Sequence, residues 1–184
     1  VDNALLAVAL ATPAHGALSD TLALLPQLTG VRGRMERAAL LPNGAAAYVD
    51  YAHTPDALAR LLTSLRPHAR GRLVLVFGAG GDRDSGKRAL MGQEAAQGAD
   101  IAIITDDNPR TENPATIRAA IRTGAPNALE IPDRRTAIAD ALALLEPDDA
   151  LVVAGKGHAQ GPITGTDFLP LDDADITSTP AGQA

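Results

Sequence analysis

The stretch "RLVLVFGAGGDRDSGKRALMG", residues 72–92, joins an apolar run to a glycine-rich segment and then to a helical pattern. The apolar run, residues 72–77, predicts a strand, and the glycines after it predict a tight turn. A helix is expected over residues 87–97. A strand, a polar loop and a helix in this order are the repeating unit of an α/β fold.

The same alternation continues along most of the chain. Further strands are expected at residues 46–50, 100–105, 128–131 and 150–154, and further helices at 55–65 (capped by Thr54), 114–122 and 134–145. Strands that alternate with helices of this length indicate a doubly wound, mostly parallel sheet of about six strands with helices on both faces. A strand at 35–41, joined to its neighbour through the turn "PNG", is expected to be antiparallel. The segment "GTDFLPL" (165–171) is expected to add a short last strand.

Residues 1–30 have a different pattern. "VDNALLAVALAT" (1–12) predicts a helix that is capped by Asn3 and has one apolar face, formed by Leu5, Leu6, Ala9 and Leu10. A second helix is expected over residues 19–28, and "TGVRG" (29–33) is typical of a linker. These features place a domain boundary near residue 30.

The bulk composition excludes several classes of protein. The chain has 184 residues, 46% apolar and 2% aromatic, and a formal charge of −6. It therefore lacks the basic surface that nucleic-acid binding needs, and the absence of cysteine excludes disulfides, thiolate metal sites and cysteine nucleophiles. No apolar run reaches the roughly 18 residues that span a membrane, and the N-terminus lacks the pattern of a secretory signal. We expect a cytoplasmic protein with no nucleic-acid or membrane partner.

Four polar segments each follow a predicted strand directly: "DYAHTPD" (50–56), "GAGGDRDSGKR" (78–88), "DDNPRTE" (106–112) and "GKGHAQG" (155–161). In open parallel sheets, ligands bind beyond the carboxyl ends of the strands. The four segments carry most of the polar, glycine-rich and basic residues of the domain. We therefore expect them to converge on one binding site.

The glycine-rich segment matches a phosphate-binding P-loop only in part. From Gly81 it fits G-x-x-x-x-G-K, but Arg88 stands where the motif places the Ser or Thr that ligates magnesium. Two aspartates in the loop would also face the phosphates unfavourably. The sequence is compatible with a plain strand-to-helix turn or with a carboxylate site built from three basic side chains, Arg83, Lys87 and Arg88.

The other segments also have two interpretations each. "TDDNPRTE" (105–112) is either an ordinary Asn-Pro turn or a recognition site for an amino-acid zwitterion, with Arg110 for the carboxylate and an aspartate for the ammonium. His53 is either a general base or a hydrogen-bonded turn residue. Lys156 and His158 lie either in a flexible turn or in a backbone nest facing an anion. No His, Asp or Glu residues have the spacing of a metal site.

Five motifs occur in a fixed order: "GRME" (33–36), "VDYAHTPDAL" (49–58), "FGAGGDRDSGKRALMG" (77–92), "TDDNPRTE" (105–112) and "VAGKGH" (153–158). Over residues 1–175 the chain resembles the C-terminal part of the Mur ligases, most closely the members that add the third residue of the peptidoglycan stem peptide. The resemblance implies a Rossmann-like α/β fold and an ATP-dependent ligase, whose acyl-phosphate intermediate is attacked by the incoming amino acid.

The resemblance also implies a domain assignment. Residues 1–30 would be the C-terminal helices of a central ATPase domain, and residues 31–184 the domain that binds the amino acid. In the family the true P-loop and the UDP-sugar domain lie upstream, so ATP and magnesium would be bound mainly outside this chain, and we expect the chain alone to be inactive. The substrates would be meso-diaminopimelate and UDP-N-acetylmuramoyl-L-alanyl-D-glutamate, and the protein a monomer.

Carried over motif by motif, the residues that would bind the diamino acid are Arg83, Asp107, Asn108, Pro109, Arg110 and Gly155. Asn3, Arg34 and Asp50 match positions that approach ATP from across the domain cleft. No catalytic residue and no metal ligand is implied in this chain. Arg110 would meet the distal carboxylate that diaminopimelate has and lysine lacks.

The chain departs from the family pattern at Ala159. The family motif there is Gly-Lys-Gly-His-Glu, and its glutamate accepts the diaminopimelate ammonium, a role that would fall to Asp107 here; Pro162 also replaces a polar residue. Two alternatives stay open. One is a stand-alone amino-acid-binding module, which an upstream Gly-Lys-Thr loop would exclude. The other is a ligase of the folylpolyglutamate synthetase type, against which "DNPR" argues.

Overall fold

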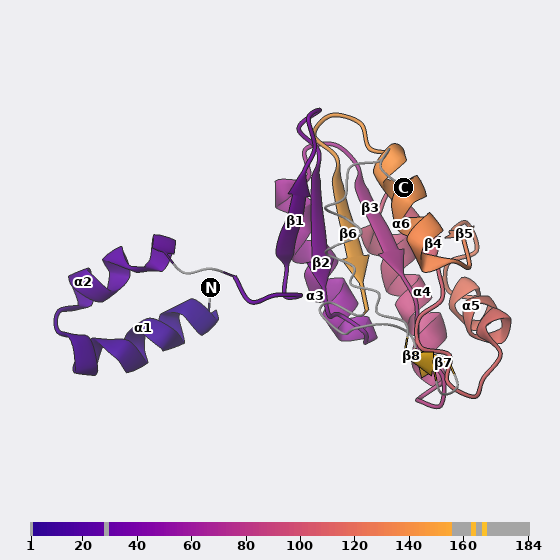
Figure 1. Cartoon of the computed structure of the whole chain (residues 1–184), viewed down its shortest axis with the longest axis horizontal. Helices are drawn as coiled ribbons and strands as arrows, with labels where there is room; N and C mark the ends of the chain where they lie inside the picture. The colour runs from indigo at the N-terminus through magenta and orange to yellow at the C-terminus, as the bar shows by residue number, and fades with distance from the viewer. Residues whose placement is uncertain (1, 28–29, 156–162, 165–166, 169–184) are drawn as a thin grey trace. The chain divides into compact units, whose positions relative to one another are not determined.

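The computed structural model describes residues 2–27, 30–155, 163–164 and 167–168, and the chain forms two compact units, Val1–Gly30 and Val31–Ala184 (Figure 1). The boundary between them lies in the segment expected to be a linker. No described helix combines the length and the hydropathy that a membrane span requires.

The N-terminal unit contains α1 (Asp2–His15), α2 (Leu18–Ala23) and the short 3-10 helix η1 (Leu25–Gln27). Because α1 begins at Asp2, Asn3 lies inside its first turn, and the expectation that Asn3 caps the helix is wrong. α2 ends earlier than expected, because Pro26 has no N–H and its ring blocks continuation of an α-helix. Large apolar side chains of this unit are exposed, those of the predicted face included: Leu5, Leu6, Leu10, Leu18, Leu22 and Leu24.

The second unit is built on a six-stranded sheet with the order β1-β2-β6-β3-β4-β5. The strands are β1 (Glu36–Leu40), β2 (Ala46–Asp50), β3 (Leu73–Phe77), β4 (Ile101–Ile104), β5 (Leu129–Glu130) and β6 (Ala150–Ala154). β1 pairs with β2 antiparallel, as predicted from the "PNG" turn, and the other four pairings are parallel. The prediction of a mostly parallel, Rossmann-like α/β sheet is therefore confirmed.

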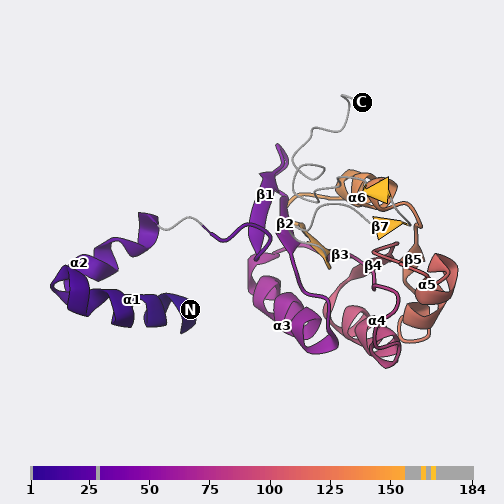
Figure 2. The same ribbon diagram turned by 60° about the horizontal axis from the view of Figure 1, so that its bottom comes forward.

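Helices cover both faces of this sheet. They are α3 (Pro55–Leu65, followed by the 3-10 turn η2, Arg66–His68), α4 (Gly86–Gly98), α5 (Pro114–Arg122) and α6 (Arg134–Ala143). Figure 2 shows α3 and α4 on one face and α6 on the other, and buried Ile117 and Ile121 place α5 in the same core as α3 and α4. Successive residues of the strands point into the two cores in turn, so Leu75 packs under α3 to α5 while Val74 and Val76 pack under α6.

Elements near the C-terminal end of the sheet also differ from the sequence expectation. β5 has only two residues, since β4 pairs with it only through Ile103 and Ile104. α6 stops at Ala143, two residues early. β7 (Ile163–Thr164) and β8 (Asp167–Phe168) form a separate antiparallel pair, so the described part of the strand expected at 165–171, Asp167–Phe168, does not join the main sheet.

Three of the helices begin at a side-chain cap. Each cap lies at the end of the loop that connects a strand to the helix. Thr54 Oγ1 accepts from the backbone N–H of Ala57 (3.3 Å), which confirms the predicted cap of α3. Asn113 and Asp133 cap α5 and α6 in the same way. A cap satisfies N–H groups that have no partner in the helix. The loops at this edge of the sheet therefore end at defined points.

α4 and α5 touch backbone to backbone. A Cβ built on Gly92 would lie 2.1 Å from Ile121 O, and one built on Gly124 would lie 1.9 Å from Ala89 O. Only glycine permits this approach. The contact fixes the two helices relative to each other, and with them the loops that precede them.

The opposite edge of the sheet is tied together by carboxylates. Asp100 accepts from the backbone N–H of Leu73 (2.7 Å) and from Arg66 Nη1 (2.6 Å). Asp149, which is almost fully buried, accepts from the backbone and side chain of Arg72. These ion pairs close the amino ends of the parallel strands, whereas the carboxyl ends open into a pocket.

Candidate functional site

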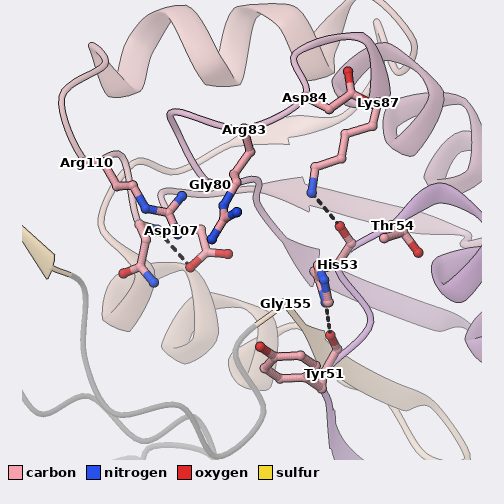
Figure 3. Close-up of a pocket in the computed structure, with 11 residues that line it drawn as sticks. Tyr51, His53, Thr54, Gly80, Arg83, Asp84, Lys87, Asp107, Arg110 and Gly155 are labelled. Carbon is pink, nitrogen blue, oxygen red and sulfur yellow. Dashed lines mark hydrogen bonds between the residues drawn. The ribbon is translucent and has the colours of Figure 1, made fainter.

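A pocket of about 520 Å³ lies at the carboxyl edge of the sheet. Its lining comes from the loops after β2, β3 and β4 and from the first residue after β6: Tyr51, His53, Thr54, Gly80, Arg83, Asp84, Lys87, Asp107, Asn108, Arg110 and Gly155 (Figure 3). Three of the four polar segments thus meet at one pocket, together with Gly155, the described residue of the fourth. β6 lies between β2 and β3, so the pocket sits beyond the carboxyl ends of the central parallel strands, which is where such folds bind ligands.

Of the six residues expected to bind a diamino acid, five line this pocket: Arg83, Asp107, Asn108, Arg110 and Gly155. Figure 3 shows the guanidinium groups of Arg83 and Arg110, from two different loops, extending toward the carboxylate of Asp107. Pro109 is placed elsewhere: it is buried, and its carbonyl accepts from the backbone N–H of Glu112 (3.0 Å). Pro109 thus shapes the turn and does not face the pocket.

The two loops that carry these arginines are hydrogen-bonded to each other along what we call the seam, made of Gly81, Asp82, Asn108, Arg110, Thr111 and Glu112. Gly81 N donates to Asn108 O (2.7 Å), and Arg110 Nη1 donates to Gly81 O. The Asp82 carboxylate accepts from Thr111 Oγ1 (2.7 Å) and from Thr111 N (3.1 Å). The seam sets the spacing between the β3–α4 loop and the β4–α5 loop.

Arg88, the residue that departs from the P-loop pattern, is buried at the seam and does not line the pocket. Its side chain is 3% exposed, and Nη1 and Nη2 donate to Glu112 Oε2 (2.9 Å) and Oε1 (2.7 Å). The expectation that Arg88 receives a ligand carboxylate is wrong, because a carboxylate of the protein already binds its fork. Arg83 and Lys87, the other two candidates, do line the pocket.

Two adjacent aspartates in the β4–α5 loop have different surroundings. Asp106 forms an ion pair with Arg118, which also donates to Glu130 (2.8 Å). Asp107 faces the pocket, and a Cβ built on Gly155 would lie 3.3 Å from its Oδ2. The φ of Gly155 is +116°, a conformation that favours glycine. Of these two adjacent aspartates, Asp107 is therefore the one whose carboxylate lines the pocket.

The other wall of the pocket comes from the loop after β2 and the first turn of α4. His53 Nδ1 lies 2.9 Å from Tyr51 O, as the turn interpretation predicts, and Lys87 Nζ donates to His53 O (2.8 Å). Partial burial lowers the pKa of Lys87, and nearby carboxylates oppose that shift. Sequence reasoning did not single out Tyr51, and it singled out Thr54 only as a helix cap, although the position of both residues just after a strand was the available signal for a site role.

Residues 33–157 match the family described as Mur ligase, glutamate ligase domain, which is more than half of the chain. The chain belongs to the Mur ligase family. The match extends from the start of the second unit to just beyond β6, so every residue that lines the pocket lies within it.

Relatives in this Mur ligase family share about half of the sequence. The chain is 56% identical over 171 residues to the UDP-N-acetylmuramoyl-L-alanyl-D-glutamate--2,6-diaminopimelate ligase of Caulobacter vibrioides, covering 93% of this chain and 35% of that protein. It is 54% identical over 173 residues to the protein of the same name from Bradyrhizobium diazoefficiens, covering 94% of this chain and 36% of that protein. The chain thus spans about a third of the length of the curated relatives it matches.

Solved structures agree with this family membership. A UDP-N-acetylmuramoyl-L-alanyl-D-glutamate--2,6-diaminopimelate ligase superposes with a TM-score of 0.74 at 39% identity, covering 93% of this chain and 36% of that one. A UDP-N-acetylmuramate-alanine ligase from Thermotoga maritima gives a TM-score of 0.61 at 20% identity, over 83% of this chain and 33% of that one. A folylpolyglutamate synthase/dihydrofolate synthase from Yersinia pestis gives 0.59 at 19%, over 77% and 36%. The last two share the fold alone.

Two of the three residues expected to approach ATP are close together in this Mur ligase domain. The Asp50 carboxylate accepts from the backbone N–H of Met35 (2.7 Å), the residue after Arg34, and from a second backbone N–H (2.8 Å). The guanidinium carbon of Arg34 lies 4.6 Å from the ring centroid of Tyr51. Arg34 thus lies over a ring that lines the pocket. Asn3 belongs to the other unit, and its side chain is outside the described part of the chain.

Lys156, His158 and Ala159 of the last polar segment, and Pro162 just after it, are outside the described residues. Within residues 2–27, 30–155, 163–164 and 167–168, no group of three or more His, Cys, Asp or Glu could hold a metal ion.

The seam is expected to weaken in acid. Hydrogen bonds from Thr111 lower the pKa of Asp82, and the ion pair with Arg88 lowers the pKa of Glu112. Unfolded carboxyl groups titrate near about 4. The stability from both groups is therefore fully present above about pH 5 and is lost as the pH falls through the lowered folded values. Unfolding followed against pH should show a shallower dependence below about pH 5 in Asp82→Asn than in the unmodified chain; equal slopes would contradict this assignment.

Proposed function

We propose that this chain is the C-terminal, amino-acid-delivering part of an ATP-dependent ligase that joins meso-diaminopimelate to UDP-N-acetylmuramoyl-L-alanyl-D-glutamate in peptidoglycan biosynthesis. Residues 1–30 would be the last helices of the central ATPase domain, and residues 31–184 the amino-acid-binding domain. The proposal is supported by relatives that carry this ligase name and by a polar pocket at the carboxyl edge of a parallel sheet. The protein would act in the cytoplasm as a monomer.

The observation that carries the proposal is the meeting of Arg83 and Arg110 over one pocket. meso-Diaminopimelate has an amino-acid group at each end, so it presents two carboxylates and two amines. Two guanidinium groups match two carboxylates, since each fork can donate two parallel hydrogen bonds. Asp107 and Asn108 lie in the same pocket and supply acceptors for the ammonium of the unreacting end. Lysine, which lacks the second carboxylate, would leave one guanidinium without its partner.

In this proposal the chain contributes to the reaction by positioning the diamino acid. ATP, when bound, supplies the phosphoryl group that activates the substrate carboxyl group for attack by an amine. The pocket would hold one end of the diamino acid and leave the other amine free to approach that carboxyl group from across the domain cleft. Holding two reactants in attack geometry can lower a barrier by about 7–11 kcal/mol. Arg34 and Asp50 of this domain, and Asn3 of the N-terminal unit, would approach the nucleotide, and magnesium would be bound by the rest of the enzyme.

Arg110→Ala tests the pocket directly. The variant should weaken the binding of meso-diaminopimelate by about 10- to 150-fold, because the loss of a charge-assisted contact costs about 1.5–3 kcal/mol. Binding of L-lysine should change far less. NMR titration of the 184-residue chain with each ligand measures both affinities, including weak ones.

Arg122→Ala is the matched control for this experiment. Arg122 is an arginine of the same domain whose side chain is 52% exposed and which does not line the pocket. It should leave both affinities unchanged. Equal binding of meso-diaminopimelate and lysine to the unmodified chain, with no effect of Arg110→Ala, would rule out the assigned pocket.

Catalysis requires the remainder of a ligase. Fusing this chain behind the N-terminal remainder of the Caulobacter vibrioides relative, in place of the matching 35%, gives a complete protein for an amide-forming assay. The proposal expects activity with meso-diaminopimelate over lysine. Activity with lysine alone would contradict it.

A further inference from the structure

Arg88 and Glu112 do not line the pocket, yet they form a strong ion pair beside it. Arg88 Nη1 donates to Glu112 Oε2 (2.9 Å) and Nη2 donates to Glu112 Oε1 (2.7 Å), and Arg88 is 3% exposed. Glu112 Oε1 also accepts from the backbone N–H of Asp82 (2.6 Å). One carboxylate of the β4–α5 loop thus binds both the start of α4 and the loop before it. A lysine in place of Arg88 would offer no planar fork and would not reproduce this contact.

The seam contains backbone strain on both sides. Asp82 has a φ of +50° and Arg110 a φ of +51°, the left-handed region that non-glycine residues rarely adopt. Such conformations persist only where several surrounding contacts hold the backbone in place, and they are common at ligand-binding sites. Here the contacts lie on both sides of Arg110. Asn108 is bonded to Gly81, and Glu112 is bonded to Asp82 and Arg88.

We infer that the Arg88–Glu112 ion pair determines specificity: it holds the backbone of Arg110 in its left-handed conformation, so that the guanidinium group faces the pocket and selects ligands with a second carboxylate. This inference rests on the proposed function. Arg88 and Glu112 are positioning residues, since neither lines the pocket and each acts through Arg110. Loss of the pair frees the turn to relax to an ordinary φ, and the direction of the Arg110 side chain changes with it.

The measured quantity is selectivity, the dissociation constant for L-lysine divided by that for meso-diaminopimelate, from NMR titrations of the 184-residue chain. Glu112→Gln keeps the shape of the side chain and removes its charge. We expect it to lower the selectivity about tenfold, mainly through weaker diaminopimelate binding. Thr111→Val, which removes only the hydroxyl that binds Asp82, is a milder second variant in case Glu112→Gln folds poorly; it should lower selectivity in the same direction.

Asp100→Asn controls for general loss of stability. Like Glu112, Asp100 accepts from one backbone N–H and one arginine, but at the opposite edge of the sheet. It should lower the melting temperature and leave the selectivity unchanged. If Glu112 had only a structural role, Glu112→Gln would behave like Asp100→Asn: it would lower the melting temperature and leave the selectivity unchanged.

The double variant Glu112→Gln/Arg110→Ala shows whether Glu112 acts through Arg110. If it does, Glu112→Gln causes no further loss of selectivity once Arg110 is absent, because the two changes remove the same contact. Unchanged selectivity in Glu112→Gln and Thr111→Val, or additive losses in the double variant, would overturn the inference while Arg110→Ala still supports the pocket. Selectivity of one in the unmodified chain would instead reject the proposed function, and the inference with it.

Discussion

Replacing Gly124 by alanine is expected to lower the free energy of unfolding by about 3 kcal/mol, the upper end of the usual cost of overpacking. A Cβ at this position would lie 1.9 Å from Ala89 O and 2.7 Å from Gln93 N. Both atoms belong to the backbone of α4, which cannot turn aside as the end of a side chain can. The variant must therefore push the end of α5 away from α4. That movement opens the core in which Met91 and Ile121 are buried.

Urea unfolding followed by far-ultraviolet circular dichroism measures this loss, since the chain has no tryptophan to report by fluorescence. Gly30→Ala is the control, because a Cβ there would meet nothing within 4 Å and the backbone is not left-handed. It should change the unfolding free energy by less than about 0.5 kcal/mol. A Gly124→Ala variant as stable as the unmodified chain would contradict the direct contact between the two helices.

The sheet was predictable from the sequence because its signals are local. The run 72–77 and the later apolar runs are dense in β-branched and aliphatic residues, and the helices begin at Pro or at capping side chains. The Thr54 cap of α3 and the antiparallel pairing of β1 with β2 were both predicted from such local signals. The strand at 128–131 was also predicted, but its shortening to Leu129–Glu130 was not, because the length of this edge strand is set by its pairing with Ile103 and Ile104 of β4.

The site was predictable as a set of loops but not as a geometry. The rule that ligands bind beyond the carboxyl ends of parallel strands predicted one shared edge for the four polar segments, and the structure shows it for three of them and for Gly155. It did not separate Arg88 from Arg83, since both are basic residues of one loop. Their difference comes from Glu112, which is 24 residues from Arg88 along the chain and bonds to it only after the sheet has formed. The placement of Pro109 away from the pocket has the same cause, because the pairing of the two loops turns that residue inward.

Gly81→Ala is expected to remove most of the binding of meso-diaminopimelate, by about 100-fold or the equivalent of roughly 2.7 kcal/mol. A Cβ at Gly81 would lie 1.9 Å from Pro109 O and 2.7 Å from Pro109 C. To accept it, the β3–α4 loop must move away from the β4–α5 loop. Arg83 and Arg110 are carried by these two loops, so a shift on the order of one ångström separates the two guanidinium groups that a diacid must bridge, and ligand contacts are that sensitive.

The cost of this substitution should appear in binding more than in folding. The clash lies between two surface loops and not in either core, so the unfolding free energy should fall by less than in Gly124→Ala. Gly86→Ala is the control at the other end of the same loop, because its Cβ would approach only Asp84 Oδ1, at 3.2 Å, and that carboxylate can turn aside. NMR titration with meso-diaminopimelate should show near-normal affinity for Gly86→Ala. Normal binding by Gly81→Ala would show that the seam does not control the distance between Arg83 and Arg110. A methyl group placed at the tightest contact between the two loops would then have left both arginines able to bind the ligand.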